Sequence, residues 1–266
     1  MKTGKFSLAL ALLLLLSTTS AWTATRPGLP RLGGKPNLNG IWETMNSANW
    51  NLEDHSAQKV DSQWQLGALF AIPAGKSVVV GGRIPYLPEA LKTRDQYRAG
   101  WPKSDPETLC YLPGVPRATY MPYPFQIIQG TRNILMVYSY ATANRTIYLG
   151  KHEDPPVDSW MGRSEGHWEG DTLVVQTAGF NGQAHLDRAG NFFSPALKVV
   201  ERFTLESPTV IRYEATLTDP QTFSAPWTIR MPLYKHVEQN AELLEYKCVP
   251  FVEELMYKDL ELPGKR

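Results

Sequence analysis

The sequence predicts an all-β protein in which an antiparallel sheet closes into a barrel or curls strongly on itself, with an irregular amino-terminal third and one short helix. Two observations carry this prediction. From Phe125 onward, short runs of β-branched and aromatic residues follow one another, and turn sequences such as Gly130–Asn133 and Glu206–Thr209 separate them at hairpin spacing. Almost no helical periodicity lies between these runs. Because closure leaves no exposed sheet edge, a barrel or a strongly curled sheet is the expected arrangement.

The hairpin predicted most clearly is centred on Glu169-Gly170-Asp171, where glycine and aspartate supply the turn between two strand-like runs. An earlier strand is expected at Asn39–Met45, and Pro88–Gly100 has the start and stop signals of a short surface helix. A short apolar strand is expected at Val78–Val80, and an irregular connector at Pro102–Pro124. The nine runs of the carboxy-terminal part are Phe125–Gln129, Ile134–Tyr140, Arg145–Leu149, Gly166–Glu169, Thr172–Ala178, Val199–Leu205, Val210–Thr218, Trp227–Pro232 and Leu243–Cys248.

The amino terminus has the pattern of a secretory signal peptide. Lys2 and Lys5 precede an apolar run, Leu8–Leu16, and small polar residues follow up to Ala21. This run is shorter than the roughly 20 residues that cross a bilayer, so we expect cleavage, export to the periplasm or beyond, and no membrane anchor. The expected domains are a signal peptide (1–21), an extended leader (22–39) and a single barrel-like domain (40–266).

Charge and cysteine content restrict the partners and the redox state. Without Lys2 and Lys5, 25 of the 27 basic residues remain against 26 acidic ones, a formal charge of −1, which gives no long-range attraction to nucleic acid. The two cysteines, Cys110 and Cys248, are expected to form a disulfide in an oxidising compartment; two separate buried thiols are the alternative.

A longer pattern links the central hairpin to later segments. It comprises Gly166-His167-Trp168-Glu169-Gly170-Asp171-Thr172-Leu173-Val174-Val175, Phe180-Asn181, Asp219-Pro220 and Pro226-Trp227-Thr228. With Arg145–Leu149 and Glu245-Tyr246, this pattern resembles a large family of exported bacterial proteins with no settled activity, over about residues 36 to 250. The resemblance implies export and a coherent single-domain fold, and it assigns no catalytic role.

A second resemblance concerns the fold alone. The stretch Asn37–Trp42 looks like the glycine-x-tryptophan start of lipocalin-type barrels. The segment between Trp42 and Phe125 lacks the long alternating strands of that pattern, so a simple eight-stranded topology is not implied.

Candidate catalytic residues come from the histidines and one loop. His185 and Asp187 are two residues apart in a loop bracketed by glycines, and Arg188 follows, so an aspartate that orients an imidazole beside an arginine is a coherent arrangement. The alternative is an Asp–Arg pair that holds the loop to Glu201 or Arg202. The other candidates are His167 and His55, although His167 also suits a structural, hydrogen-bonded role.

The function predicted is capture of a small, largely apolar molecule, with a cofactor-free enzyme (isomerase, lyase or hydrolase) and a structural protein with a solid barrel as alternatives. Polar residues of the strands that point inward would line a water-filled barrel interior; alternatively, these residues point outward into solvent. No histidine pair has metal-ligand spacing, so neither a metal nor a cofactor is expected, and the oligomeric state stays open. The candidate ligand-binding residues are Trp42, Trp50, Trp168, Glu201, Arg202 and Trp227.

Overall fold

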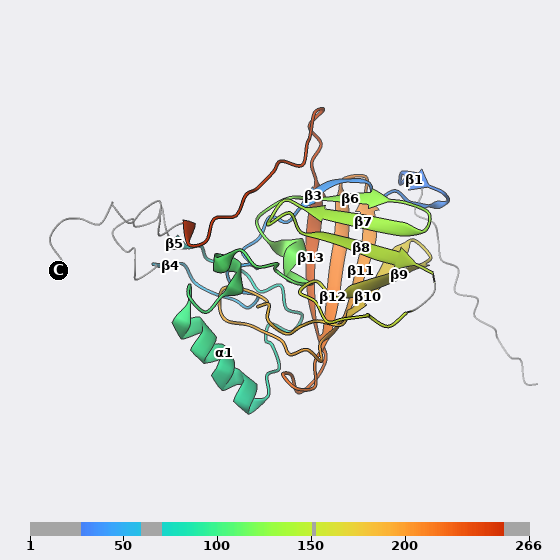
Figure 1. Ribbon diagram of the computed structural model, residues 1–266. Helices are drawn as coiled ribbons and strands as arrows, with labels where there is room; N and C mark the ends of the chain where they lie inside the picture. The colour runs from blue at the N-terminus through green and yellow to red at the C-terminus, as the bar shows by residue number, and fades with distance from the viewer. Residues whose placement is uncertain (1–27, 60–70, 151–152, 253–266) are drawn as a thin grey trace, which may run out of the picture.

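Eight strands from Phe125 onward and one earlier strand form a closed barrel in the computed structural model, which describes residues 28–59, 71–150 and 153–252 (Figure 1). The nine strands follow the order β10-β11-β12-β13-β3-β6-β7-β8-β9 around the barrel. They are β3 (Gly40–Glu43), β6 (Phe125–Gln129), β7 (Asn133–Tyr138), β8 (Asn144–Leu149), β9 (Arg163–Glu169), β10 (Thr172–Ala178), β11 (Lys198–Ser207), β12 (Val210–Thr218) and β13 (Trp227–Lys235). The predicted all-β barrel is confirmed.

Neighbouring strands pair antiparallel everywhere in the barrel except between β8 and β9. That parallel pair runs from Ile147↔Ser164 to Leu149↔Gly166. The predicted hairpin joins β9 to β10, and Gly170 has a φ of 58°, the left-handed region that a two-residue turn requires.

The core lies inside the barrel because alternate residues of each strand point inward. Along β12, Ile211, Tyr213, Ala215 and Leu217 are fully buried, whereas the residues between them are partly exposed. Each large apolar side chain buried in this way contributes about 1.5–3 kcal/mol of favourable transfer free energy. Other fully buried side chains of the barrel strands are Trp42, Phe125, Ile134, Ile147, Val175, Ile229 and Leu233.

A polar cluster is enclosed within this apolar interior. The Arg145 guanidinium contacts both carboxylate oxygens of Glu201, and it also donates to the hydroxyls of Ser164 (2.6 Å) and Thr177 (2.9 Å). Tyr213 donates its hydroxyl to Glu201 at 2.9 Å. Burial lowers the pKa of Arg145, but the charge and hydrogen bonds of Glu201, together with Tyr138 and Tyr213, outweigh burial and raise it. The guanidinium therefore stays charged, and its hydrogen bonds offset the cost of desolvation.

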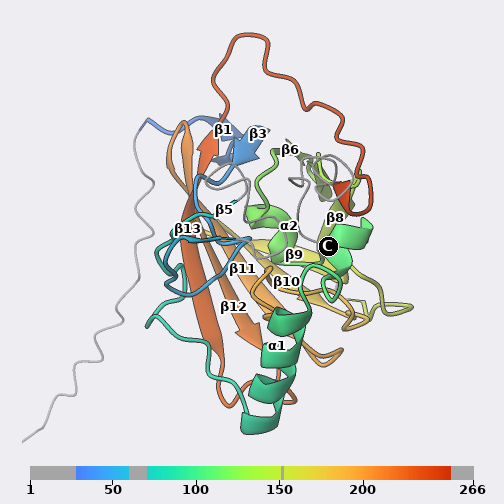
Figure 2. The ribbon, with the colours of Figure 1, turned by 90° about the vertical axis from the view of Figure 1, so that its left-hand side faces the viewer.

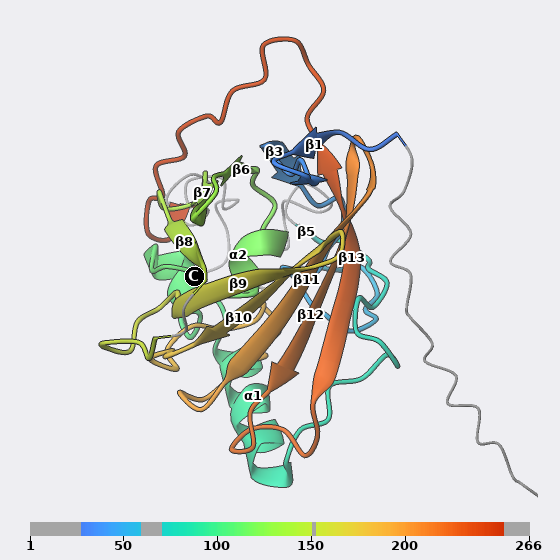
Figure 3. The same cartoon turned by 90° about the vertical axis from the view of Figure 1, so that its right-hand side faces the viewer.

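The described segments between β3 and β6 pack around one end of the barrel (Figures 2 and 3). Helix α1 (Pro88–Gly100) occupies the predicted range, with proline in its first turn and Arg98 in its last. The segment predicted as an irregular connector instead contains the short helices η2 (Pro106–Leu109) and α2 (Arg117–Tyr120), and all four residues of α2 are buried. The predicted strand at Val78–Val80 is reduced to a single bridge from Val79 to Ile229 of β13.

The segment predicted as an extended leader contains a small hairpin. Strands β1 (Arg31–Leu32) and β2 (Lys35–Pro36) pair across two glycines with positive φ. The Arg31 guanidinium contacts both carboxylate oxygens of Asp171, at 2.7 and 3.1 Å, which ties this hairpin to the β9–β10 turn. A second short pair, β4 (Gln58–Lys59) with β5 (Ala71–Ile72), lies outside the barrel sheet.

The strand predicted at Leu243–Cys248 is wrong. Because β13 pairs with both β12 and β3, it offers no free edge, and the described part of the arm that follows it has one isolated bridge, between Tyr140 and Tyr246, in place of a strand. The arm is held by a disulfide from Cys110 to Cys248, with 5.6 Å between the Cα atoms, so the predicted disulfide is confirmed and two separate thiols are excluded. Figure 1 shows the arm leaving β13 and returning toward η2.

The predicted signal peptide, Met1–Ala21, lies outside the described residues. Within the described part of the chain, no helix has the length and apolar character needed to cross a membrane.

Candidate ligand-binding site

Two connections leave the same end of the barrel and meet the amino-terminal third there. The β10–β11 connection (179–197) and the β12–β13 connection (219–226) share this end because β10 and β12 both pair antiparallel with β11. Arg188 donates its backbone N–H to the Asn49 carbonyl, and Gly190 fits so closely against α1 that an added Cβ would lie 2.5 Å from the Arg98 nitrogen. Residues distant in the sequence are therefore packed into one region.

A buried ion network forms the floor of this region. The Arg117 guanidinium of α2 donates to both carboxylate oxygens of Asp105 at 2.9 Å, to Asn49 at 2.9 Å and to Glu107 at 3.3 Å. Burial alone would raise the pKa of Asp105, but the charge and hydrogen bonds of Arg117 lower it overall. All of these side chains are buried, so charge-assisted hydrogen bonds hold the network together away from water.

Glu107 connects this floor to a second arginine. Arg188 donates its Nε and Nη2 hydrogens to the two Glu107 oxygens, each at 2.8 Å. Its guanidinium carbon lies 4.4 Å from the ring centroid of Trp50 and 5.9 Å from that of Trp101. The carboxylate fixes the arginine in position while the indole rings cover its planar group.

A hollow of about 160 Å³ opens beside these groups, and we call it the Trp50–Trp101 hollow. The two indole rings meet at 60°, with 5.8 Å between their centroids. His55, Arg98 and Arg188 also line it. Among the described residues, the indole nitrogen of Trp101 and the Nε2 atom of His55 are buried without a hydrogen-bond partner. The wall of the hollow combines aromatic surface with two guanidinium groups.

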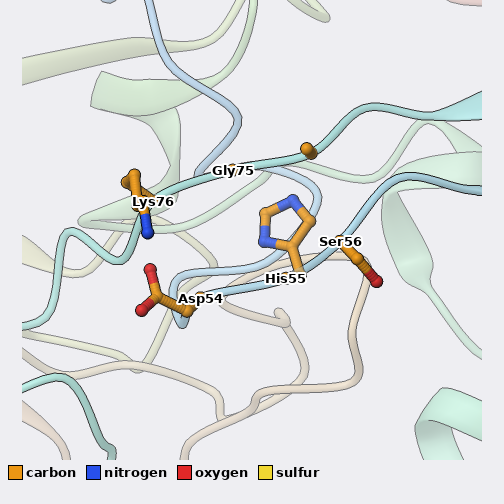
Figure 4. A pocket seen from close by; sticks show the side chains of 6 residues that line it. Asp54, His55, Ser56, Gly75 and Lys76 are labelled. Carbon is orange, nitrogen blue, oxygen red and sulfur yellow. The ribbon is translucent and has the colours of Figure 1, made fainter.

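His55 also borders a broader hollow of about 490 Å³, shown in Figure 4. Its segment and that of Gly75 exchange two backbone hydrogen bonds, and Figure 4 shows Asp54 and Lys76 facing each other beside the imidazole ring. The His55 Nδ1 atom lies 2.9 Å from the Glu53 carbonyl, which can only accept, so Nδ1 carries the proton and Nε2 is left as the acceptor in the neutral ring.

The combination of His185, Asp187 and Arg188 expected from the sequence is not assembled. Asp187 accepts hydrogen bonds from the backbone of Leu52, Ala189 and Asn191 and from the Asn191 side chain, at 2.6 to 3.2 Å, so it organises its own loop. Arg188 turns to Glu107 instead. The alternative attachment of the loop to Glu201 or Arg202 is also not found, because Glu201 pairs with Arg145.

His185 lies beside the buried ion network. Its ring centroid is 4.5 Å from that of Tyr97, and its Nδ1 atom is 3.8 Å from Asp105, with no hydrogen-bond partner among the described residues. Burial lowers the pKa of His185 to about 4, with the charge of Asp105 opposing and that of Arg117 reinforcing the change. Burial also raises the pKa of Asp187 to about 6. At neutral pH His185 is therefore uncharged and a weak base.

The remaining predicted residues lie elsewhere. His167 is 54% exposed on the outer barrel wall, where its Nε2 is 3.2 Å from Glu169, and Arg202 binds the same carboxylate at 3.0 Å. Trp168 lies near them, with the Lys35 ammonium 6.0 Å from its ring centroid. Trp42, Glu201 and Trp227 are buried in the barrel. Of the predicted site residues, Trp50, His55 and Arg188 come together in the hollow.

Sequence reasoning did not assign four residues that build this region, namely Arg98, Trp101, Glu107 and Arg117. Trp101 is one of eight tryptophans, and nothing nearby in the sequence marks it as a site residue. Arg98 is a basic residue in the last turn of α1, a position that by itself indicates a helix end and not a binding site. Glu107 and Arg117 lie in a proline-rich segment without periodicity, so no local signal marked them as buried.

The described residues contain no group of three or more His, Cys, Asp or Glu side chains arranged to hold a metal ion. The chain matches no protein-family model, and a comparison with curated proteins found no significant match.

Proposed function

We propose that the protein is an exported small-molecule-binding protein built on a lipocalin-like barrel, and that its ligand occupies the Trp50–Trp101 hollow. The observation that supports this most directly is the placement of Arg188. It is fixed by two hydrogen bonds to a buried carboxylate and stacks on Trp50 at the wall of a hollow. A binding group held in this way loses little conformational freedom when a ligand arrives.

The sequence suggested a largely apolar ligand inside the barrel, and the packing favours a site outside it. Inward-pointing rings contact one another directly, as Phe203 and Tyr213 do at 5.0 Å and Phe125 and Tyr138 do at 5.4 Å. The polar groups that would have lined a wet lumen, Arg145 and Glu201, are bonded to each other. Helix α2 is itself buried, and Tyr120 donates its hydroxyl to the Leu186 carbonyl at 2.7 Å.

Binding is favoured over catalysis by the state of the ionisable groups. A general base works best with a pKa near the operating pH, whereas burial holds the pKa of His185 at about 4. The Asp187 carboxylate accepts hydrogen bonds from four N–H groups within and beside its loop, so it does not orient the His185 imidazole. Export is supported by the signal-like sequence of residues 1–21 and by the disulfide, which is typical of oxidising compartments.

The proposal is tested on the mature, disulfide-bonded chain with a library of small metabolites, read out by melting temperature and tryptophan fluorescence. A binding compound should lose about tenfold or more in affinity in Trp50→Leu, which removes the aromatic face under Arg188. Trp168→Leu is the matched control. The Lys35 ammonium also lies over the ring of this tryptophan, but Trp168 is near the β9–β10 turn and does not line the hollow. Affinity unchanged in Trp50→Leu, or a library in which no compound binds the wild type, would refute the proposal.

A further inference from the structure

We infer that the Trp50–Trp101 hollow selects a small aromatic acid, a single aromatic ring that carries a carboxylate. This inference rests on the proposed function and adds the chemical class of the ligand. It follows from the size of the hollow, the nature of its walls and the sign of its charge.

Size restricts the ligand to about one ring. The hollow encloses about 160 Å³, close to the roughly 150 Å³ of an apolar cavity that accommodates benzene. Drug-sized ligands generally occupy pockets of about 300 Å³ or more. A fused multi-ring compound or a long acyl chain would therefore leave much of its surface outside.

The walls favour a flat, π-rich ligand. Trp50 and Trp101 both line the hollow and their rings meet at 60°, so a ligand ring stacked against one indole would meet the other edge-on. Arg188 already covers part of both rings, so the ligand would contact the indole surface that the guanidinium leaves open. Aromatic rings prefer these offset and edge-to-face arrangements. A saturated ring of the same size would fill the space but gain less from the two indoles.

Charge favours an anion. Among the described residues that line the hollow there are two arginines, Arg98 and Arg188, and no aspartate or glutamate. Glu107 neutralises Arg188 from behind, whereas Arg98, exposed on the last turn of α1, has no ion-pair partner among the described residues. The lining thus carries one uncompensated positive charge at its rim. A carboxylate placed there can accept charge-assisted hydrogen bonds from the Arg98 guanidinium.

Other hollows carry weaker arguments. The hollow beside Asp54 and Lys76 presents both charges and is open, so it does not select an anion. A third hollow, of about 260 Å³ near the β8–β9 pair, borders Arg145, whose N–H groups already contact Glu201 and neighbouring hydroxyls. The Trp50–Trp101 hollow is therefore the site with a single, consistent preference.

The experiment measures binding of four probes of similar size to the mature, oxidised protein: benzoate, benzyl alcohol, cyclohexanecarboxylate and benzylammonium. Benzoate should bind about tenfold or more tightly than each of the others, and its affinity should fall as sodium chloride is added. Arg98→Gln should weaken benzoate about tenfold and leave benzyl alcohol unchanged. Lys92→Gln is the matched control, because Lys92 is an exposed cation of the same helix, paired with Glu89.

The outcomes separate this inference from the proposed function. If benzyl alcohol or benzylammonium binds as tightly as benzoate, and Trp50→Leu abolishes that binding, the hollow is a ligand site but the inferred acid is wrong. If benzoate binding is insensitive to Arg98→Gln, or equal for cyclohexanecarboxylate, the inference is also overturned. If neither these probes nor the metabolite library binds in a manner that depends on Trp50, the proposed function fails as well.

Discussion

Replacing His185 with glutamine should make the fold less sensitive to acid. The imidazole is 6% exposed and packs against Tyr97, with Asp105 and Arg117 as its charged neighbours. Burial lowers its pKa from 6.5 to about 4, so the unfolded chain takes up a proton in mild acid that the folded protein does not. Stability is therefore fully present above pH 6.5 and is lost as the pH falls toward 4.

The magnitude follows from these two pKa values. Between pH 7.5 and pH 4.5 the linkage relation gives a loss of about 2.5 kcal/mol in the free energy of unfolding from this one group. Asp187 acts in the opposite direction, because its pKa is raised from 3.8 to about 6, and its stabilising effect at low pH is lost as the pH rises through 6. That contribution is shared by wild type and variant, so it cancels when their losses are compared.

The assay is urea unfolding of the oxidised protein at both pH values. His185→Gln should lose about 2.5 kcal/mol less than wild type between them. His167→Gln is the matched control, because it makes the same exchange at a 54% exposed histidine outside the buried network. Equal losses in wild type and His185→Gln would show that His185 is not held neutral by burial, and the description of the network around it would be wrong.

Three further predictions concern stability. Glu201→Leu should cost about 3–5 kcal/mol in urea unfolding because it leaves the Arg145 charge buried and unpaired, and the double variant Arg145→Met, Glu201→Leu should recover most of that loss; a double variant as unstable as the single one would contradict this. Gly75→Ala should lower the melting temperature by the equivalent of about 1–3 kcal/mol, because the new Cβ would lie 1.9 Å from the Ser47 hydroxyl, and an unchanged temperature would mean that this contact relaxes freely. Cys248→Ser should reduce the free energy of unfolding by up to about 5 kcal/mol, the loop-closure value for a separation of 138 residues. The measurement is guanidinium unfolding, and a midpoint equal to that of wild type would show that the disulfide constrains the unfolded chain little.

Local patterns were sufficient for much of the fold. Alternation along Val210–Thr218 placed Ile211 and Tyr213 inside, and the Gly170-Asp171 turn and the signals at the ends of Pro88–Gly100 each depend on a few neighbouring residues. The disulfide was also within reach, because the chain contains only two cysteines. The segment Leu243–Cys248 shows where local patterns fail. Its residues favour a strand, but a strand needs a neighbouring strand with an unpaired edge, and the closed barrel leaves none.

The candidate site depends on contacts between residues far apart in the chain. Trp50, Trp101 and Arg188 meet only because barrel closure brings the 179–197 connection against the wrapped amino-terminal third. Likewise, nothing near Glu107 in the sequence indicates that it will bind two arginines. Periodicity and turn chemistry act over a few residues and therefore determined the strands, whereas burial, pairing and pKa depend on the assembled surroundings, which only the tertiary structure decided.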